Sequence, residues 1–378
     1  MKNRIIGPDD PALAVLQQQL LDHPEWETEL IIFPWAEYQP MMESSLKEET
    51  SSYQAVCVPG HIWLPGLVSN NWLADFDTLL PELDPIARQT YQPEDIILSV
   101  ANECKLNGKQ YILPLFTDGH LVFYRKDLLN LTSAVDVPII NPLDLPQILE
   151  KSTKNDDIFP FALKAHPSEI LLDWLPYLWA AGGKVWDSQK QQPLFNSPEA
   201  VKALEFYVSL KSFCPENTHT FGNQEISDLL KSGKVMMATS WGGQAALILD
   251  DGNPYRDLFG TALFTSPWNA TWGISIPQNQ AMERKVEILS TLFKAASPQQ
   301  DREVTRVAGS PVRYSSYSDN QLSRYSWLEA QQQMLNRCQM LPTDPKFSKY
   351  LGPLYEAVYQ VFMGEITPTE ALEKAAQS

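Results

Sequence analysis

The sequence predicts an α/β protein, and three observations indicate this class. Short apolar runs of strand length alternate along the chain with amphipathic segments of helix length. Several of the amphipathic segments start with a helix-capping residue followed by proline. The 378 residues exceed the ~150 that are typical of one domain, so we expect two lobes.

The capped segments define expected helices. In each of them, Asp, Ser or Thr stands at the cap position and Pro at the first helical position, where its missing N–H is not needed. Two of them also have Gln or Glu three residues after the cap, which is the spacing of a capping box. The four cap pairs are Asp10-Pro11, Ser197-Pro198, Ser297-Pro298 and Thr367-Pro368.

The apolar runs define expected strands. Their alternation with helices implies βαβ units and mainly parallel sheets, in which ligands bind in the loops beyond the carboxyl ends of the strands. Functional residues are therefore expected directly after each strand. The expected strands are Arg4–Ile6, Glu29–Phe33, Ala55–Val58, Leu121–Tyr124, Val235–Thr239 and Gly273–Ile276.

The composition disfavours charged macromolecular partners. The chain is 44% hydrophobic and 20% charged, as expected for a globular protein, and its net charge is −17. Binding to phosphates needs clustered Lys and Arg, so neither nucleic acid nor an anionic membrane surface is an expected partner. No run of ~18 apolar residues predicts a membrane span, and the start lacks a signal-peptide apolar run. These residues leave open whether the protein is cytoplasmic or has lost a signal segment.

The cysteines give no sign of a metal or redox site. Cys57, Cys104, Cys214 and Cys338 are far apart and form no CxxC pair. We expect buried free thiols, with one disulfide as the alternative, and neither a metal nor a cofactor.

Aromatic and short polar residues lie at the ends of the expected strands, most of them after a strand and Trp268 and Trp272 just before one. Aromatic rings can stack on the C–H faces of a sugar while carboxylate, imidazole and hydroxyl groups bind its hydroxyls, so this combination predicts a sugar site. The candidate residues are Asp9, Asp10, Trp35, Glu37, Tyr38, His61, Trp63, Thr117, Asp118, Trp241, Gly242, Trp268, Trp272 and Gly273. Each has a structural alternative: a Trp can pack in the core, Asp10 can cap a helix, and Tyr38 can pack at a helix start.

Seven segments in order resemble the extracytoplasmic solute-binding proteins of ABC importers, in particular the sugar-binding group that includes maltose-binding protein. The resemblance covers nearly the whole chain, although the usual lipoprotein cysteine near the start is missing. The segments are "PWAEYQPMMESSL", "SYQAVCVPGHIWLPGLVSNNWLADFDTLL", "YILPLFTDGHLVFYRKDLL", "WLPYLWAAGGKVWD", "LLKSGKVMMATSWGG", "AGSPVRYSSYSD" and "GEITPTEALEKAA".

The resemblance implies a periplasmic-binding-protein-like fold of type II topology. Two α/β lobes would enclose a ligand cleft and be joined by a hinge. The expected lobes are 1–114 with 268–311 and 115–267 with 312–378. The expected crossing segments are Pro114–Gly119, Phe264–Thr271 and Pro311–Arg313.

The resemblance also implies a function and three more site residues. The protein would capture a di- or oligosaccharide or a glycoside by hinge closure and deliver it to a membrane permease, outside the cytoplasm, as a monomer and without catalysis. Trp174 and Tyr350 would be aromatic walls of the second lobe, and Arg313 would bind a hydroxyl or a charged substituent.

Three alternatives remain open at this level. The ligand could be a polyol, a sugar-glycerol osmolyte or a sulfosugar. The protein could be a sensor that signals ligand occupancy to a membrane receptor. A glycoside hydrolase would need a carboxylate pair, for which Asp118 and Glu37 could be nominated, but the chain has no GxSxG, HExxH or P-loop motif.

Overall fold

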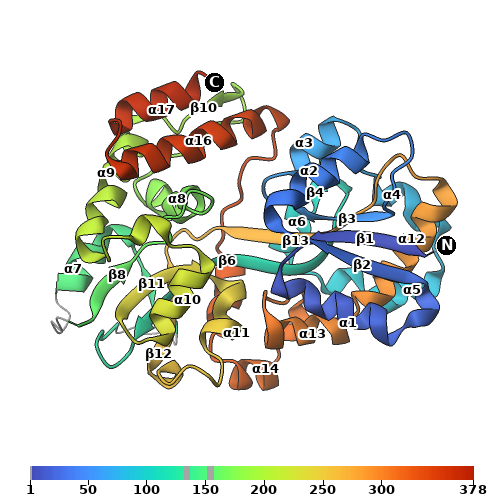
Figure 1. Ribbon diagram of the computed structural model, residues 1–378, viewed down its shortest axis with the longest axis horizontal. Helices are drawn as coiled ribbons and strands as arrows, with labels where there is room; N and C mark the ends of the chain where they lie inside the picture. Colours follow the sequence, from blue (N-terminus) through green and yellow to red (C-terminus); the bar gives the residue numbers. More distant parts are fainter. Residues whose placement is uncertain (1, 132–136, 151–156) are drawn as a thin grey trace. The chain divides into compact units, whose positions relative to one another are not determined.

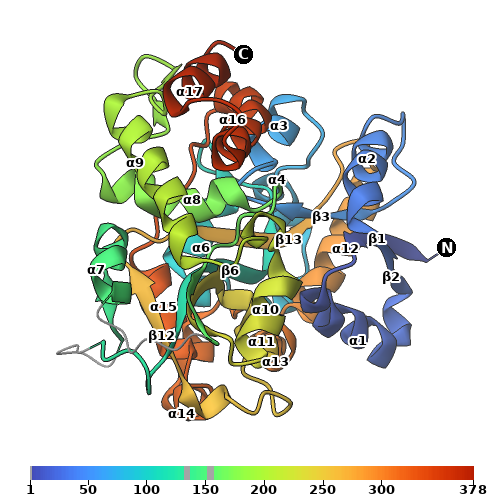
Figure 2. The same ribbon diagram turned by 60° about the vertical axis from the view of Figure 1, so that its left-hand side comes forward.

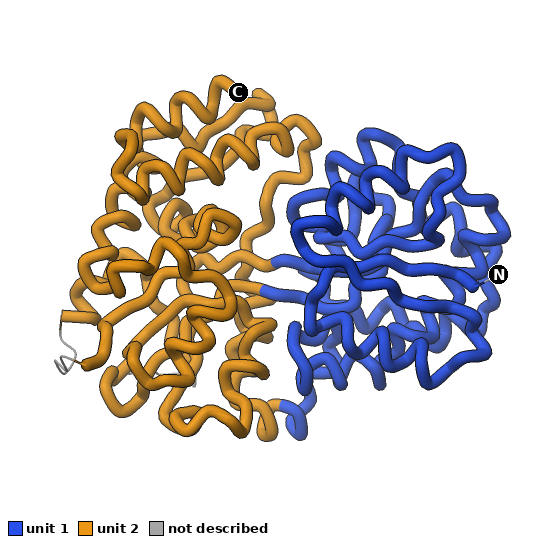
Figure 3. The backbone as a smooth tube through the Cα atoms, in the orientation of Figure 1, with its two compact units in different colours: residues 1–118, 270–321 blue, residues 119–269, 322–378 orange. Residues whose placement is uncertain are grey.

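Two compact units make up the computed structural model, which describes residues 2–131, 137–150 and 157–378. Unit 1 comprises Met1–Asp118 and Ala270–Gln321, and unit 2 comprises Gly119–Asn269 and Leu322–Ser378 (Figure 3). From the sequence we expect the chain to pass from one lobe to the other after residues 114, 267 and 311. In the structure it passes from one unit to the other after residues 118, 269 and 321. Trp268 therefore lies in unit 2 and Arg313 in unit 1, the reverse of the expected assignment.

Unit 1 is an α/β layer structure built on a short sheet. Its strands are β1 (Asn3–Pro8), β2 (Thr28–Phe33), β3 (Ala55–Pro59), β4 (Lys105–Leu106), β5 (Lys109–Gln110) and the unit 1 parts of β6 (Leu113–Arg125) and β13 (Asn269–Ser275). Its helices are α1 (Ala14–Asp22), α2 (Trp35–Leu46), α3 (Leu64–Ser69), α4 (Phe76–Leu79), α5 (Pro85–Tyr91), α6 (Leu98–Glu103), α12 (Met282–Ala295), α13 (Pro298–Val307) and the start of α14 (Asp319–Arg324).

The sheet of unit 1 brings the carboxyl ends of strands β1, β2 and β3 to one edge. β1 is parallel to both β2 and β3, with Ile5 paired to Leu30 and to Ala55. β13 is antiparallel to β3 and pairs Trp272 with Pro59, so it places Trp272 at that same edge. Figures 1 and 2 show α2 and α3 over one face of this sheet and α1 over the other.

Unit 2 has a mixed sheet and a cover of longer helices. Its strands are the rest of β6, then β7 (Ile139–Ile140), β8 (Phe159–Ala162), β9 (Trp186–Asp187), β10 (Gln192–Pro193), β11 (Val235–Trp241) and β12 (Phe259–Phe264). Its helices are α7 (Leu145–Glu150), α8 (Ile170–Ala180), α9 (Pro198–Ser209), α10 (Asn223–Lys231), α11 (Ala245–Ile248), α15 (Leu328–Leu335), α16 (Pro345–Met363) and α17 (Pro368–Ala376). In both views α16 and α17 lie side by side (Figures 1 and 2).

The sheet of unit 2 is only partly parallel. β11 is parallel to β8 but antiparallel to β6, and β12 is antiparallel to β6 but parallel to β7. The expectation of mainly parallel sheets is therefore wrong for this unit. Above the sheet, α8 packs against α9 and α16, and each of its residues from Ile170 to Leu178 is buried.

The polar tetrad Thr117-Asp118-Gly119-His120 lies inside a strand and forms no turn. β6 is continuous over its 13 residues and passes from unit 1 into unit 2 between Asp118 and Gly119. Glycine is needed at 119 because a Cβ there would overlap the side chain of Met334 and lie 3.0 Å from the carbonyl oxygen of Trp268. The small residue thus permits close packing within unit 2.

The structure also shows the state of the cysteines. All four cysteines are free thiols, two of them buried, so the disulfide alternative is wrong. Among the described residues, no helix is both long and apolar enough to cross a membrane.

Candidate functional site

An aromatic cluster stands at the carboxyl ends of the parallel strands of unit 1. Trp35 follows β2, and His61 and Trp63 follow β3. The ring of Trp272 lies at the centre, 5.3 Å from Trp35, 6.1 Å from His61 and 6.2 Å from both Trp63 and Phe116 between ring centroids. Trp35 is 45% exposed, and Trp63, His61 and Trp272 are half-buried. We call these five residues the Trp272 cluster.

Uncharged and negative polar groups accompany this cluster. Asp9 follows β1 and is exposed, and its backbone N–H donates to the carbonyl of Phe33 at the end of β2 (2.8 Å). Glu37 is exposed in the first turn of α2. Burial lowers the pKa of His61 to about 3, so its imidazole is neutral at physiological pH. These groups can accept hydrogen bonds from hydroxyls.

Asp10 and Thr117 have structural partners in unit 1. The Asp10 carboxylate accepts from the backbone N–H of Ala12 (2.9 Å), as a helix cap does, and burial raises its pKa. Thr117 is fully buried, and its hydroxyl donates to the carbonyl of Ala270 (3.3 Å). Asp118 is half-buried at the end of unit 1.

The structure corrects the assignment of Tyr38. Its side chain is fully buried, and its hydroxyl donates to the carbonyls of Cys57 (2.5 Å) and Ile6 (3.3 Å). Both carbonyls belong to central strands, so the hydroxyl is occupied inside the sheet layer. Tyr38 is a core residue that supports Trp63, whose ring centroid lies 6.3 Å away.

The contacts of Arg313 give no support to its expected role as a ligand residue. Its side chain is 1% exposed and lies within unit 1. The guanidinium donates to the carbonyls of Gln92 (3.0 Å) and Ala296 (2.6 Å) and lies over the ring of Tyr91, 4.7 Å from its centroid. Its planar set of donors holds three segments of unit 1 together.

The two candidate glycines are explained by packing. A Cβ on Gly273 would overlap the carbonyl oxygen of Leu113, so glycine lets β13 approach β6. A Cβ on Gly242 would overlap the side-chain amide of Gln331. At both glycines an added Cβ would meet protein atoms, and their expected contact with ligand stays a prediction.

A second group of candidate residues surrounds Trp241 in unit 2. Trp241 ends β11 and is 5% exposed. Its Nε1 donates to Oε2 of Glu169 (2.8 Å), and the ammonium of Lys164 lies 3.5 Å from its ring centroid. The ring of Trp268 is 4.7 Å away in an edge-to-face arrangement, and that of His120 is 5.8 Å away.

A buried carboxylate forms hydrogen bonds with several residues near Trp241. Asp173 on α8 is fully buried. It accepts hydrogen bonds from the hydroxyls of Thr239 (2.6 Å) and Tyr207 (2.9 Å) and from the backbone N–H of Lys164 (3.2 Å), and it lies 3.1 Å from Nε2 of His120. Asp173 thus joins β6, β11, α9 and the segment after β8.

The two other aromatic candidates of unit 2 are packed away from solvent. Trp174 exposes none of its surface in the buried helix α8. Tyr350 is 9% exposed and packs against Trp186 (5.7 Å) and Phe195 (6.1 Å). Their role as ligand walls stays a prediction without support from these contacts.

Sequence reasoning missed Lys164 and Glu169. Both follow the carboxyl end of β8, where the strand-end rule would have placed candidates. β8 was not expected because it is four residues long and contains Pro160, which disfavours strand assignment.

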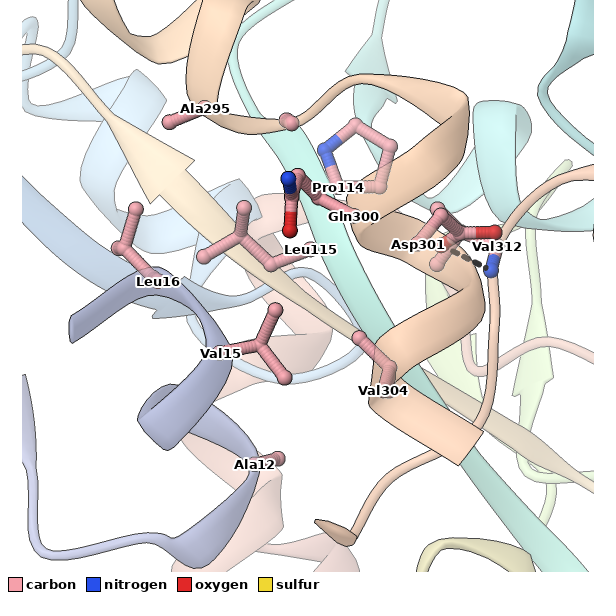
Figure 4. Close-up of a pocket in the computed structure, with 11 residues that line it drawn as sticks. Ala12, Val15, Leu16, Pro114, Leu115, Ala295, Gln300, Asp301, Val304 and Val312 are labelled. Carbon is pink, nitrogen blue, oxygen red and sulfur yellow. Dashed lines mark hydrogen bonds between the residues drawn. The ribbon is translucent and has the colours of Figure 1, made fainter. Parts of the chain in front are cut away.

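A small cavity in unit 1 lies between α1, β6 and α13 (Figure 4). Its volume is about 20 Å³, and Val15, Leu16 and Val304 are among its apolar walls. Ligand pockets for small molecules have volumes of about 300–1,000 Å³, so this space is a packing defect that no sugar could enter.

Comparison with known proteins identifies relatives that cover most of the chain. Residues 22–325 match the family described as bacterial extracellular solute-binding protein. A mannitol-binding protein of Pseudomonas aeruginosa is 23% identical over 320 residues, which cover 76% of this chain and 72% of that protein.

Solved structures show the same fold. Maltose-bound MalE3 of T. maritima superposes with a TM-score of 0.84 at 20% identity, covering 100% of this chain and 98% of that one. An ABC-transporter solute-binding protein from Agrobacterium radiobacter in complex with ribitol gives 0.85 at 17% identity, covering 100% and 97%. The expectation of a periplasmic-binding-protein fold is confirmed.

Proposed function

Because the chain belongs to the bacterial extracellular solute-binding protein family, we propose that it is the substrate-binding component of an ABC importer and that its ligand is an uncharged sugar or sugar alcohol. The family binds solutes rather than converting them, which excludes the hydrolase alternative. The observation that supports this ligand class best is the Trp272 cluster, whose most exposed ring is that of Trp35.

The chemistry around the cluster favours a polyhydroxylated, neutral ligand. Indole faces bind C–H surfaces, and the exposed carboxylates of Asp9 and Glu37 accept hydrogen bonds from hydroxyls. An anionic ligand would be repelled by these carboxylates and would find a neutral imidazole at His61. Arg313, the residue nominated for a charged substituent, is committed to backbone carbonyls. The sulfosugar alternative is therefore disfavoured.

The relatives support both a cyclic and an open-chain ligand. They include a maltose-bound MalE3, a solute-binding protein in complex with ribitol and a mannitol-binding protein. A sugar ring and a linear polyol both present C–H surfaces and hydroxyls, so one aromatic cluster can serve either. Titrations with D-mannitol, ribitol and maltose distinguish a linear polyol from a sugar with rings.

Capture would follow hinge closure. β6 and β13 both run from one unit into the other, so their backbone is where a hinge motion would bend. The ligand would bind to one unit first and gain further contacts from the second, and those gained contacts would favour the closed state. The closed protein would then deliver the solute to a permease.

A panel of three neutral compounds and one phosphorylated compound tests the proposal. The protein is unfolded and refolded to remove any bound solute, and its melting temperature is measured with D-mannitol, ribitol, maltose and mannitol 1-phosphate. A neutral ligand at 100 times its dissociation constant stabilises the folded state by about 2.7 kcal/mol. We expect a shift with at least one neutral compound and none with the phosphate. A shift with the phosphate alone would reject the neutral class.

A further inference from the structure

Lys164 is a buried lysine whose ammonium group has polar and aromatic partners. It lies two residues after β8, and its side chain is fully buried. Burying an ammonium group is unfavourable unless polar partners replace its hydration. The ammonium donates a hydrogen bond to Oδ1 of Asn223, lies 3.6 Å from Oε2 of Glu169 and lies 3.5 Å from the ring centroid of Trp241. These partners belong to different segments of unit 2 and meet at this cation.

The indole of Trp241 is held at its face and at its edge. The Lys164 ammonium occupies one face, where the negative potential of the ring attracts a cation. At the edge, Nε1 donates to the same Glu169 oxygen that faces Lys164 (2.8 Å). The hydrogen bond restricts the direction of the ring and the cation restricts its plane. Each of the three residues Lys164, Glu169 and Trp241 thus contacts the other two.

The carboxylate of Asp173 binds both the segment that carries Lys164 and the strand that carries Trp241. The N–H of Lys164 donates to Oδ2 of Asp173 (3.2 Å), and the hydroxyl of Thr239 donates to Oδ1 of the same residue (2.6 Å). Thr239 lies two residues before Trp241 on β11. The two segments that carry the ammonium and the indole are therefore tied to the same carboxylate.

We propose that Lys164 is a positioning residue that fixes the plane of the Trp241 indole for ligand binding. This inference rests on the proposed function and takes Trp241, one of the aromatic candidates of the sequence, as a contact for the sugar or polyol. An indole that is already ordered loses less conformational freedom when the ligand binds, and affinity rises accordingly. Lys164 acts through Trp241 and does not itself touch the ligand.

Unit 2 supplies a control with a cation next to a ring, at an exposed lysine rather than a buried one. The Lys211 ammonium lies 4.7 Å from the ring centroid of Phe362 and donates to the carbonyl of the same residue (2.7 Å). Phe362 is a buried residue of α16 and no candidate for ligand contact. Lys211→Met therefore removes a comparable contact that has no role in the proposal.

The first experiment needs no ligand. The indole N–H resonance of Trp241 is assigned by its loss in Trp241→Phe, using protein labelled with nitrogen-15. Lys164→Met should shift or broaden this resonance, Lys164→Arg should restore it by returning a cation, and Lys211→Met should leave it unchanged. An unchanged resonance in Lys164→Met would overturn the proposal. Should that variant fail to fold, Lys164→Gln, which is uncharged but can still hydrogen-bond, takes its place.

The second experiment measures affinity for D-mannitol and maltose by calorimetry. Lys164→Met should weaken binding of the better ligand at least tenfold, and Lys164→Arg should recover most of the loss. In a Trp241→Leu background, which has no ring for the cation to contact, the same substitution should change affinity less than twofold, because its effect passes through the indole. An equal loss in both backgrounds would mean a general structural role and contradict the proposal. If neither compound binds the wild-type protein, the titration with ribitol decides whether the proposed ligand class fails, and the indole resonance alone decides the role of Lys164.

Discussion

At the residue scale, Trp35 offers the sharpest test of the Trp272 cluster. It is 45% exposed, so replacing it removes stacking surface with little loss of packing. We expect Trp35→Leu to weaken binding of the neutral ligand about tenfold, which corresponds to about 1.4 kcal/mol. The measurement is a calorimetric titration, with the unfolding free energy determined in parallel.

The control for this variant is another tryptophan of the same unit. Trp26 is half-buried and stacks on His23, with 4.3 Å between ring centroids, outside the cluster. Trp26→Leu should leave affinity unchanged. Equal losses of affinity in the two variants would show that the cluster has no special role.

Asp301 predicts a specific dependence of stability on pH. Its carboxylate accepts from the backbone N–H of Val312 (2.9 Å) and of Arg313 (3.2 Å) and from the hydroxyl of Ser316 (2.6 Å). Burial still dominates and raises its pKa from 3.8 to about 6. The folded state therefore holds this proton more tightly than the unfolded state does. The resulting stabilisation is complete below pH 3.8 and is lost as pH rises through about 6.

The substitution Asp301→Asn isolates this effect, because asparagine does not titrate. The unfolding free energy of the wild type should fall relative to that of the variant by up to about 3 kcal/mol between pH 4 and 7. Urea denaturation at several pH values measures the difference, with Asp22→Asn as a control at an exposed carboxylate. Parallel pH profiles for wild type and Asp301→Asn would refute this account.

Sequence reasoning placed Trp35 and Trp63 correctly after strands, but it put Trp272 before a strand that contains it, and it could not tell which way the side chains point. Trp63 and Tyr38 both follow strands, yet Trp63 is half-buried and Tyr38 is fully buried with its hydroxyl on two strand carbonyls. That difference depends on which face of a helix or loop meets the sheet. The contacts of Arg313 were not foreseen for a similar reason, because its backbone acceptors at Gln92 and Ala296 come from distant segments.

At the scale of elements, the contact between β13 and β6 predicts a strict need for glycine at 273. A Cβ there would overlap the carbonyl oxygen of Leu113, and backbone atoms of paired strands cannot move apart freely. Gly273→Ala should lower the unfolding free energy by about 1–3 kcal/mol. Urea denaturation provides the measurement.

A second glycine supplies the comparison. Gly66 lies in α3 with no atom within 4 Å of a Cβ at that position. Alanine favours a helix over glycine by about 1 kcal/mol, so Gly66→Ala should be neutral or stabilising. A stable Gly273→Ala variant would show that the two strands can separate without loss.

Helix starts were easier to predict than sheet topology. Side chains of Asp10, Ser197 and Thr367 cap the first turns as expected, because a cap depends only on neighbouring residues. The antiparallel pairing of β6 with β11 and β12 depends on long-range contacts that no local pattern shows. Pro114 and Gly119 also obscured the full length of β6.

At the scale of the whole molecule, the order of weak motifs was more informative than any one of them. Seven segments in sequence indicated the family, and residues 22–325 match it. The compact units change after 118, 269 and 321, near but not at the expected positions, because no local signal marks where a crossing strand leaves one unit. The ligand is less determined than the fold, since it depends on a few side chains at strand ends.

The most direct test of the central claim is a calorimetric titration of the refolded, ligand-free protein with D-mannitol, ribitol and maltose. The account predicts saturable binding of at least one of them with one site per chain, and recovery of the compound unchanged. Absence of heat with all three, or conversion of the compound by substoichiometric protein, would contradict a receptor for a neutral sugar or sugar alcohol.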